Sequence, residues 1–382
     1  MARFYCLLFI FICLAGQGTR AQDSSHLRIS LLTCTPGDEL YSIFGHSAIR
    51  ITDSSSVTDI VYNYGTFNFD DEGFYIKFIR GKLPYYLSIV DFPDFQWDYQ
   101  ATNRGMSEQI LNLSPAEKTI FQHRLNENLK EENKYYQYDF FLDNCTTRLR
   151  DAIIQISQPA PQLPAVMPVS TTFREAIHQY LDAGKQPWSK LGIDILLGAP
   201  TDAIMTPAQQ QFLPDNLMAA LDKSSNKKMV ESKKNLYPFT PFHEVNIITP
   251  FLFCTGLLLL FIVLQLFTSS PSSRLMQGMD GMLFFFTGLL GILLIFMWTG
   301  TDHSMTKDNY NLLWAWPTHI IAAFLIIKNN RALKIYFTIA SVFLTLVLLA
   351  WFFLPQQLNP ALIPFNLLLL YRMATRLFTY EN

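Results

Sequence analysis

Long apolar runs fill the last third of this chain, and they constrain its fold more than any other feature. Four of them, and a shorter fifth interrupted by proline, cover residues 247–267, 282–298, 312–327, 335–354 and 361–371. An α-helix needs about 20 apolar residues to cross the hydrocarbon core of a bilayer. The sequence therefore predicts an all-α membrane domain of about five transmembrane helices, which we assign to residues 236–382.

The basic residues between the apolar runs predict how the chain crosses the membrane. The connections on one side carry only Lys307, whereas those on the other side carry Arg274, Lys328, Arg331, Lys334, Arg372 and Arg376. Because short cytoplasmic loops are enriched in Lys and Arg, the richer side is expected to be cytoplasmic. The residues before the first run are then expected on the external side.

The N-terminus has the features of a secretory signal. Arg3 precedes an apolar stretch over residues 4–15, and Thr19-Arg-Ala21 resembles a small-residue cleavage site. An uncleaved anchor is the alternative, but the stretch is short for a membrane span. We therefore expect residues 1–21 to be a signal peptide and residues 22–235 to form an external soluble domain.

Composition narrows the chemistry of the soluble domain. The formal net charge of the chain is -2, which argues against a nucleic-acid partner. The sequence has no glycine-rich phosphate loop and no zinc-type spacing of cysteine and histidine. We therefore expect neither a metal nor a cofactor.

Strand-like and helix-like segments are mixed in the soluble domain, which predicts an α+β fold. Strands are expected where apolar, β-branched or aromatic residues cluster, over residues 27–32, 48–52, 60–64 and 83–90. Helices are expected within residues 67–79, after Ser114 and after Thr172. The helix after Ser114 has a proline at its first position and a capping-box glutamate. A charged, polar connector is expected over residues 223–234.

His46 and Cys145 are the pair on which we expect the chemistry to depend. Cys145 heads a predicted helix over residues 146–154, and a helix N-terminus favours the thiolate form of a cysteine. His46 follows Gly45 in a turn that leads into a strand. Such a pair supports acyl transfer, in which the thiolate forms a thioester and the histidine moves protons.

Further groups would complete such a site. Asn63, on the next strand, is expected to orient the His46 ring, with Tyr64 as the alternative. The oxyanion is expected to be held by the Cys145 backbone N–H together with a donor from the segment before His46, with Tyr41 as the candidate. From spacing alone, a buried structural cysteine near a structural histidine accounts for the same residues.

The other cysteines leave a structural alternative for Cys145. After the signal the chain contains only Cys34, Cys145 and Cys254, and Cys254 falls in an apolar run. An oxidising compartment permits a disulfide between Cys34 and Cys145. In that case Cys145 is structural and the protein is a non-enzymatic membrane scaffold.

The order and context of these residues resemble known acyltransferases. A histidine followed much later by an Asn-Cys at a helix start is similar to the permuted papain-like folds of the NlpC type, which include lecithin:retinol acyltransferase (LRAT). The whole chain resembles the Lnb type of bacterial lipoprotein N-acyltransferase. The matching stretches are residues 32–50, 62–67, 78–83, 143–148, 298–303 and 311–314.

That resemblance implies an activity, a location and a site. It implies a multi-pass protein of the bacterial inner membrane whose periplasmic domain takes an acyl chain from a phospholipid. The chain would pass to the N-terminal amine of a diacylglyceryl-cysteine lipoprotein. His46 and Cys145 are implied as catalytic, and Asn63, Arg148 and His303 carry over as further site residues.

Several of these residues leave alternatives open. Arg148 is either a solvated helix cation or a phosphate contact. Asp302 and His303 lie in a loop expected on the external side. They would complete the site, orient a lipid headgroup or only solvate the loop. A membrane-tethered cell-wall amidase or peptidase that uses Cys145 and His46 is the alternative enzyme.

Overall fold

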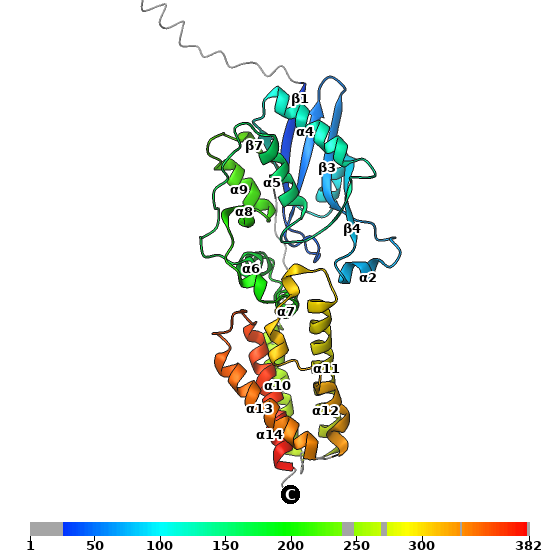
Figure 1. Cartoon of the computed structure of the whole chain (residues 1–382), viewed down its shortest axis with the longest axis vertical. Helices are drawn as coiled ribbons and strands as arrows, with labels where there is room; N and C mark the ends of the chain where they lie inside the picture. Colours follow the sequence, from blue (N-terminus) through cyan, green and yellow to red (C-terminus); the bar gives the residue numbers. More distant parts are fainter. Residues whose placement is uncertain (1–25, 239–247, 269–272, 329–330, 380–382) are drawn as a thin grey trace, which may run out of the picture.

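The computed structural model describes residues 26–238, 248–268, 273–328 and 331–379, so the predicted signal peptide lies outside the described residues. The described chain forms an α+β part and a helical part, stacked along the long axis of the molecule (Figure 1). The α+β part holds the residues predicted to carry the chemistry, and the helical part holds the apolar runs.

A seven-stranded antiparallel sheet organises the α+β part, with the strand order β6-β4-β3-β2-β1-β5-β7. Its strands are β1 (Leu27–Cys34), β2 (His46–Asp53), β3 (Thr58–Thr66), β4 (Pro84–Asp91), β5 (Met106–Leu111), β6 (Tyr135–Gln137) and β7 (Val230–Tyr237). The four predicted strands are present as β1 to β4. The short helix predicted between β3 and β4 is also present, as α2 (Phe74–Ile79).

Helices cover both faces of this sheet. One face carries α3 (Phe92–Ala101), and the other carries α4 (Pro115–Asn128), α5 (Cys145–Ile156) and α9 (Pro214–Asp222). Even-numbered apolar side chains of β1 pack in the core with α3, and odd-numbered ones pack with α5, as the two-residue period of a strand requires. The sheet is therefore buried on both sides.

Three helices begin where the sequence places a cap. Ser114 and Glu117 form a capping box at the start of α4, and Thr172 and Glu175 form one at the start of α6 (Phe173–Ala183). α5 begins at Cys145, as predicted. Further short helices are η1 (Ala199–Asp202), α8 (Pro207–Gln210), η2 (Ser304–Thr306) and η5 (Pro360–Leu362).

The sequence did not predict β5 and β7. β5 lacks the alternation of a strand because Glu108 and Gln109 are both buried, where Glu108 pairs with Arg50 at 3.2 Å and Gln109 donates to Asp222 at 2.6 Å. β7 replaces part of the polar connector expected over residues 223–234, and this corrects that expectation. Its charged side chains are exposed at the sheet edge, where charge discourages pairing with another chain.

The helical part contains three helices long and apolar enough to cross a membrane, α10 (Pro250–Phe267), α11 (Arg274–Thr299) and α13 (Arg331–Ala350). A further helix, α14 (Ile363–Thr379), covers the predicted run at 361–371 and packs against α10 and α13. These helices correspond to four of the five predicted runs.

The run at residues 312–327, predicted as one membrane span, is broken rather than a single continuous helix. Pro317 lies in the break, because proline lacks the N–H that a helix interior needs. A Cβ at Gly288 of α11 would lie 2.6 Å from the Ile320 nitrogen, so this glycine lets the irregular backbone pack closely against α11. The run divides into η3 (Tyr310–Leu313), α12 (His319–Leu325) and η4 (Ile326–Lys328).

Two of the basic residues assigned to the cytoplasmic side are buried. Arg372 and Arg376 lie on α14 and bind the two carboxylate oxygens of Asp280 on α11, each at 2.6 Å. Buried charges are retained when they are paired in this way. This cluster joins α11 and α14.

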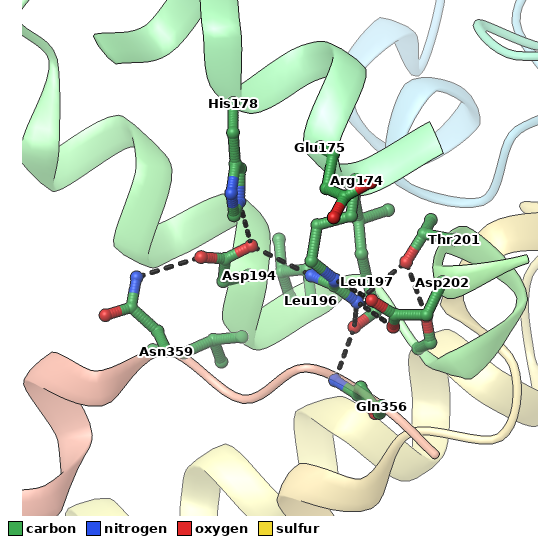
Figure 2. Close-up of polar contacts among 12 residues, drawn as sticks. Arg174, Glu175, His178, Asp194, Leu196, Leu197, Thr201, Asp202, Gln356 and Asn359 are labelled. Carbon is green, nitrogen blue, oxygen red and sulfur yellow. Dashed lines mark hydrogen bonds and ion pairs between the residues drawn. The ribbon is translucent and has the colours of Figure 1, made fainter. Parts of the chain in front are cut away.

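Arg174, on α6, is the centre of a polar network that joins the two parts (Figure 2). Its guanidinium is fully buried and binds Asp194 at 2.8 Å and Asp202 at 2.9 Å. Asp194 also accepts a hydrogen bond at 2.8 Å from Asn359, which precedes η5 in the helical part. Charge-assisted bonds therefore connect the α+β part, which is the predicted soluble domain, to the helical part, which is the predicted membrane domain. We call them the soluble part and the membrane part below.

The C-terminal end of α7 (Pro187–Leu196) is capped by the membrane part. The last carbonyls of a helix have no partner within it. Here Asn309 Nδ2 donates to Ile195 O at 2.8 Å and to Leu196 O at 3.1 Å, and Gln356 Nε2 donates to Leu197 O at 2.8 Å. These bonds fix the orientation of the soluble part relative to the membrane part.

Candidate active site

β2 begins at His46, and Gly45 shapes the turn before it. Gly45 has φ +75°, and a Cβ there would lie 2.7 Å from the Cys34 carbonyl oxygen, so a side chain does not fit. His46 Nε2 donates to Asn63 Oδ1 on β3 at 2.6 Å. This bond is the contact predicted for Asn63, and it leaves Nδ1 as the ring nitrogen that exchanges a proton with a nucleophile. The alternative, Tyr64, accepts from Asn128 at 2.7 Å instead.

Cys145 is the first residue of α5, and Asn144 caps this helix. Asn144 Oδ1 accepts from the backbone N–H groups of Thr146 and Thr147 at 2.9 Å and 2.8 Å, and its Nδ2 donates to Phe212 O at 2.9 Å. These bonds fix the start of α5 against the surrounding loops. The Cys145 thiol, which is only 7% exposed, is therefore held in a defined position.

The neighbours of Cys145 favour its charged form. Burial alone would raise the pKa of the Cys145 thiol, but the charge of His46 and hydrogen bonds from His46, the Ser47 backbone and Thr146 lower this pKa to about 7. Burial alone would lower the pKa of His46, but the charge and hydrogen bond of Cys145 and the bond to Asn63 raise it. Each group stabilises the charge of the other, so the pair favours thiolate and imidazolium.

Cys34 and Cys145 are both free thiols, so the disulfide alternative is wrong. Cys34 pairs in register with His46 across β1 and β2, but it belongs to the core beneath α3. Burial raises the pKa of the Cys34 thiol to about 12, so this thiol stays protonated. Cys254 is also free and lies in α10.

A row of aromatic rings leads away from Cys145. A Cβ at Gly65, in the irregular end of β3, would lie 3.7 Å from both the Cys145 Cβ and the Tyr138 ring, so the two residues flank this glycine. Tyr138 stacks on Tyr85 with ring centroids 4.4 Å apart. The ring centroids of Tyr85 and Phe67 lie 5.2 Å apart. The row therefore runs from the thiol towards the segment that carries α2.

Tyr41 and Arg148 were predicted to bind substrate or to hold the oxyanion. The Tyr41 side chain is 74% exposed, so its role as an oxyanion donor stays a prediction. Arg148 forms two bonds to Asp143, each at 2.7 Å, and its guanidinium carbon lies 3.6 Å above the Tyr136 ring. Arg148 is therefore paired with Asp143 rather than free in solvent, and its role as a phosphate contact stays a prediction.

The loop with Asp302 and His303 contacts the soluble part near α2. His303 Nε2 donates to Phe78 O at 3.2 Å and to Ile79 O at 3.1 Å. The backbone N–H of Asp302 donates to Arg80 O at 2.9 Å. The loop is thus docked rather than merely solvated, and it contacts the α2 turn, while its catalytic role stays a prediction.

A cavity of about 210 Å³ lies where this loop meets the turn before Cys145. Ser304 of the loop donates to Asp139 of the turn at 2.7 Å, which ties the two segments together. The volume is below the range of about 300–1,000 Å³ typical of ligand pockets, so we assign it no ligand. Its walls include the apolar side chains of Phe44, Phe140, Phe141, Ile177 and Met305.

The structure adds three residues to the predicted site: Asn144, Ser47 and Tyr138. Asn144 had a local signal, because asparagine is a preferred helix cap and it directly precedes the cysteine. The Ser47 backbone and the Tyr138 ring have no such signal, since only the folded chain brings them to Cys145. Within the described residues, no cluster of three or more His, Cys, Asp or Glu side chains is placed to hold a metal.

Comparison with known families matches both parts of the chain. Residues 16–179 match the family described as the Lnb N-terminal periplasmic domain, and this range contains His46, Asn63 and Cys145. Residues 242–382 match the family described as the Lnb transmembrane domain. No curated protein and no solved structure matches the chain significantly.

Proposed function

This chain belongs to the Lnb family, with a periplasmic N-terminal domain and a multi-helix transmembrane domain, and from that premise we propose that it is a lipoprotein N-acyltransferase. Its donor is a phospholipid of the membrane in which it sits. Its acceptor is the N-terminal amine of a diacylglyceryl-cysteine lipoprotein. Cys145 is the nucleophile, His46 is the proton carrier and Asn63 orients the His46 ring.

In the first half of the proposed reaction, the Cys145 thiolate attacks an ester carbonyl of the phospholipid. A C–S bond forms, the C–O bond to the glycerol breaks, and the lysophospholipid leaves with a proton from the His46 imidazolium. The Cys145 backbone N–H lies in the first turn of α5, where N–H groups have no partner within the helix, so it is able to stabilise the oxyanion.

In the second half, the lipoprotein amine attacks the thioester. His46 takes a proton from the amine, a C–N bond forms, and the C–S bond breaks to restore the Cys145 thiolate. The reaction exchanges an ester for an amide through a thioester and consumes no nucleotide. Both substrates are membrane lipids or are anchored by lipids, which accounts for a periplasmic domain held rigidly on a transmembrane domain.

The contact set of Cys145, His46 and Asn63 carries this proposal. A thiol with a pKa near 7, a histidine beside it and an amide 2.6 Å from that histidine form the set of roles found in cysteine acyl-transfer enzymes. The histidine begins a strand and the cysteine later heads a helix, an order that supports the permuted papain-like fold of the NlpC and LRAT type. The family match of the C-terminal part supports five transmembrane spans.

Acylation of a synthetic diacylglyceryl-cysteine peptide tests the proposal. The full chain in phospholipid nanodiscs is expected to add one acyl chain to the peptide amine, as measured by mass spectrometry. Cys145→Ser and His46→Ala are each expected to abolish the transfer, whereas Cys254→Ala, which removes a free thiol in α10, keeps it.

Full transfer by either active-site variant would overturn the assignment of these residues. Release of peptides from peptidoglycan by the wild-type chain, without any acylation of the lipopeptide, would replace the proposal with the amidase or peptidase alternative.

A further inference from the structure

α2 exposes an apolar face that the fold of the soluble part does not require. Tyr75, Ile76, Phe78 and Ile79 are all exposed, with Tyr75 at 77% and Ile76 at 67%. Phe69, in the loop before the helix, is exposed as well. Large apolar side chains gathered on one small element mark a contact surface rather than ordinary scatter.

The position of α2 identifies what this surface meets. Its last carbonyls accept from His303, and the Arg80 carbonyl after it accepts from Asp302. These two residues lie three and four positions after the end of α11, which is long and apolar enough to cross a membrane. That end contacts the periplasmic domain, so it is the outer end, and α2 lies beside it (Figure 1).

We infer that α2 inserts its exposed side chains into the outer leaflet of the membrane, next to the outer end of α11. α11 also exposes apolar side chains, Ile295 and Phe296, near its outer end. A short helix with an apolar face lies at the depth of the headgroups and the first acyl carbons. The occupant of this surface is therefore phospholipid.

The charges around α2 fit the same placement. Arg80 is exposed after the helix, and the side chain of Lys82 is about half exposed, 3.8 Å from Asp302. Lys77 on the helix pairs with Asp71 at 2.7 Å. Long basic side chains are able to bury their stems in the interface while their charges reach the phosphates.

The aromatic row links this surface to the nucleophile. The ring centroids of Phe74, on α2, and Phe67 lie 5.9 Å apart. The row continues from Phe67 through Tyr85 and Tyr138 to Cys145. We assign to this row the path by which a donor acyl chain reaches the thiol. This part of the inference rests on the proposed function, whereas insertion of α2 does not.

A spin label tests insertion without any assay of activity. Ile76→Cys, in a full chain that also carries Cys145→Ser, is labelled with a nitroxide and placed in nanodiscs of phosphatidylethanolamine and phosphatidylglycerol. Cys34 and Cys254 are buried and are not expected to label. The collision ratio is the rate at which the spin label collides with oxygen divided by the rate at which it collides with a water-soluble nickel complex. This ratio is expected to be several-fold higher at residue 76 than at the control position.

Ile120→Cys provides the matched control, because Ile120 is an exposed isoleucine on α4, far from the membrane part (Figure 1). Equal collision ratios at residues 76 and 120 would overturn the inference. Both positions are exposed, so the substitutions are not expected to disturb folding.

A kinetic comparison tests the path to the thiol. Ile76→Asp is expected to slow acyl transfer from nanodisc phospholipid by about tenfold, the factor that corresponds to losing the burial of one large aliphatic side chain. Transfer from a water-soluble short-chain phospholipid is expected to be unchanged, and Ile120→Asp is expected to alter neither rate. Equal slowing with both donors, or no slowing, would overturn the path. If no acyl transfer exists at all, the spin label still decides insertion.

Discussion

At the scale of single residues, the charge state of Cys145 is the feature most open to measurement. With a thiol pKa of about 7, the thiolate fraction rises as the pH increases through 7, since a lowered pKa keeps the group charged above that value. Alkylation of Cys145 by iodoacetamide is therefore expected to increase from pH 5 to 8 and then level off. Cys34, with a pKa of about 12, is the internal control and stays unmodified.

His46→Ala sharpens this prediction. Without the histidine only burial and weaker bonds act on the thiol, so its pKa is expected to return to its ordinary value or above. The thiolate fraction at pH 7 then falls by about 15-fold or more, and the alkylation rate falls with it. An unchanged pH profile in this variant would contradict the electrostatic coupling of the pair.

Asn63→Ala tests the role of the bond at 2.6 Å. A hydrogen bond to a charged group contributes about 1.5–3 kcal/mol, which corresponds to a loss of about 10- to 150-fold in kcat for acyl transfer. Asn128→Ala, which removes the partner of Tyr64 instead, is expected to keep kcat. Similar losses in both variants would mean that the effect of Asn63 is structural.

The site residues that could be predicted from the sequence are those that stand in a recognisable local pattern. Cys145 and His46 stand at a helix start and a strand start, and both starts are visible in the sequence. The bonds of Arg148 to Asp143 were not predicted, because side-chain pairing in a turn depends on geometry that sequence spacing does not specify. The roles of Tyr41, Asp302 and His303 in the chemistry stay predictions.

At the scale of elements, the start of α5 determines where the thiol lies. Asn144→Ala removes a helix cap and leaves the carbonyls of Phe140 and Phe212 without their donor. The expected cost is about 2–4 kcal/mol of unfolding free energy. Thermal melting of the full chain in detergent measures it, and acyl transfer is expected to fall together with the melting temperature.

Ser114→Ala is the matched control, because Ser114 caps α4 at an exposed position and binds only within its own capping box. Its expected cost is about 0.5–1 kcal/mol, with acyl transfer unchanged. Equal melting temperatures for the two variants would contradict the special role of Asn144.

The starts of the capped helices were predictable from the sequence, whereas the strands β5 and β7 were not. Caps are short patterns, so α4, α5 and α6 begin where the sequence places them. β5 buries polar side chains that find distant partners, and β7 is a polar edge strand, so neither has the alternation by which strands are recognised. The break between η3 and α12 depends on close packing against α11, which hydropathy does not report.

At the scale of the whole molecule, the network around Arg174 holds the periplasmic part on the membrane part (Figure 2). Arg174→Met leaves Asp194 and Asp202 buried without their cation, at an expected cost of about 3–5 kcal/mol. Hydrogen exchange is expected to become faster over residues 194–202, where the two parts meet.

Lys190→Met is the control for this network, because Lys190 forms an exposed ion pair with Asp182 on the same pair of helices. Such a pair contributes at most about 1 kcal/mol, so exchange at the junction is expected to stay slow. Fast exchange in both variants would mean that α6 and α7 are generally unstable, and slow exchange in both would contradict the role of Arg174.

The junction between the parts was beyond sequence reasoning. The positive-inside pattern predicted that the loop with His303 lies on the same side as Cys145, but it did not indicate what the loop contacts. Its contacts with α2 join segments more than 200 residues apart. Such pairings depend on how the sheet and the membrane helices stack, and no local pattern reports that.

The intact mass of the purified protein after incubation with phospholipid shows whether Cys145 carries an acyl group. The protein is expected to gain the mass of one acyl chain, located on Cys145 and removed by neutral hydroxylamine, as expected for a thioester. His46→Ala is expected to lack this adduct. A wild-type chain that stays unmodified, with Cys145 free and unreactive, would mean that this cysteine does not carry the acyl group.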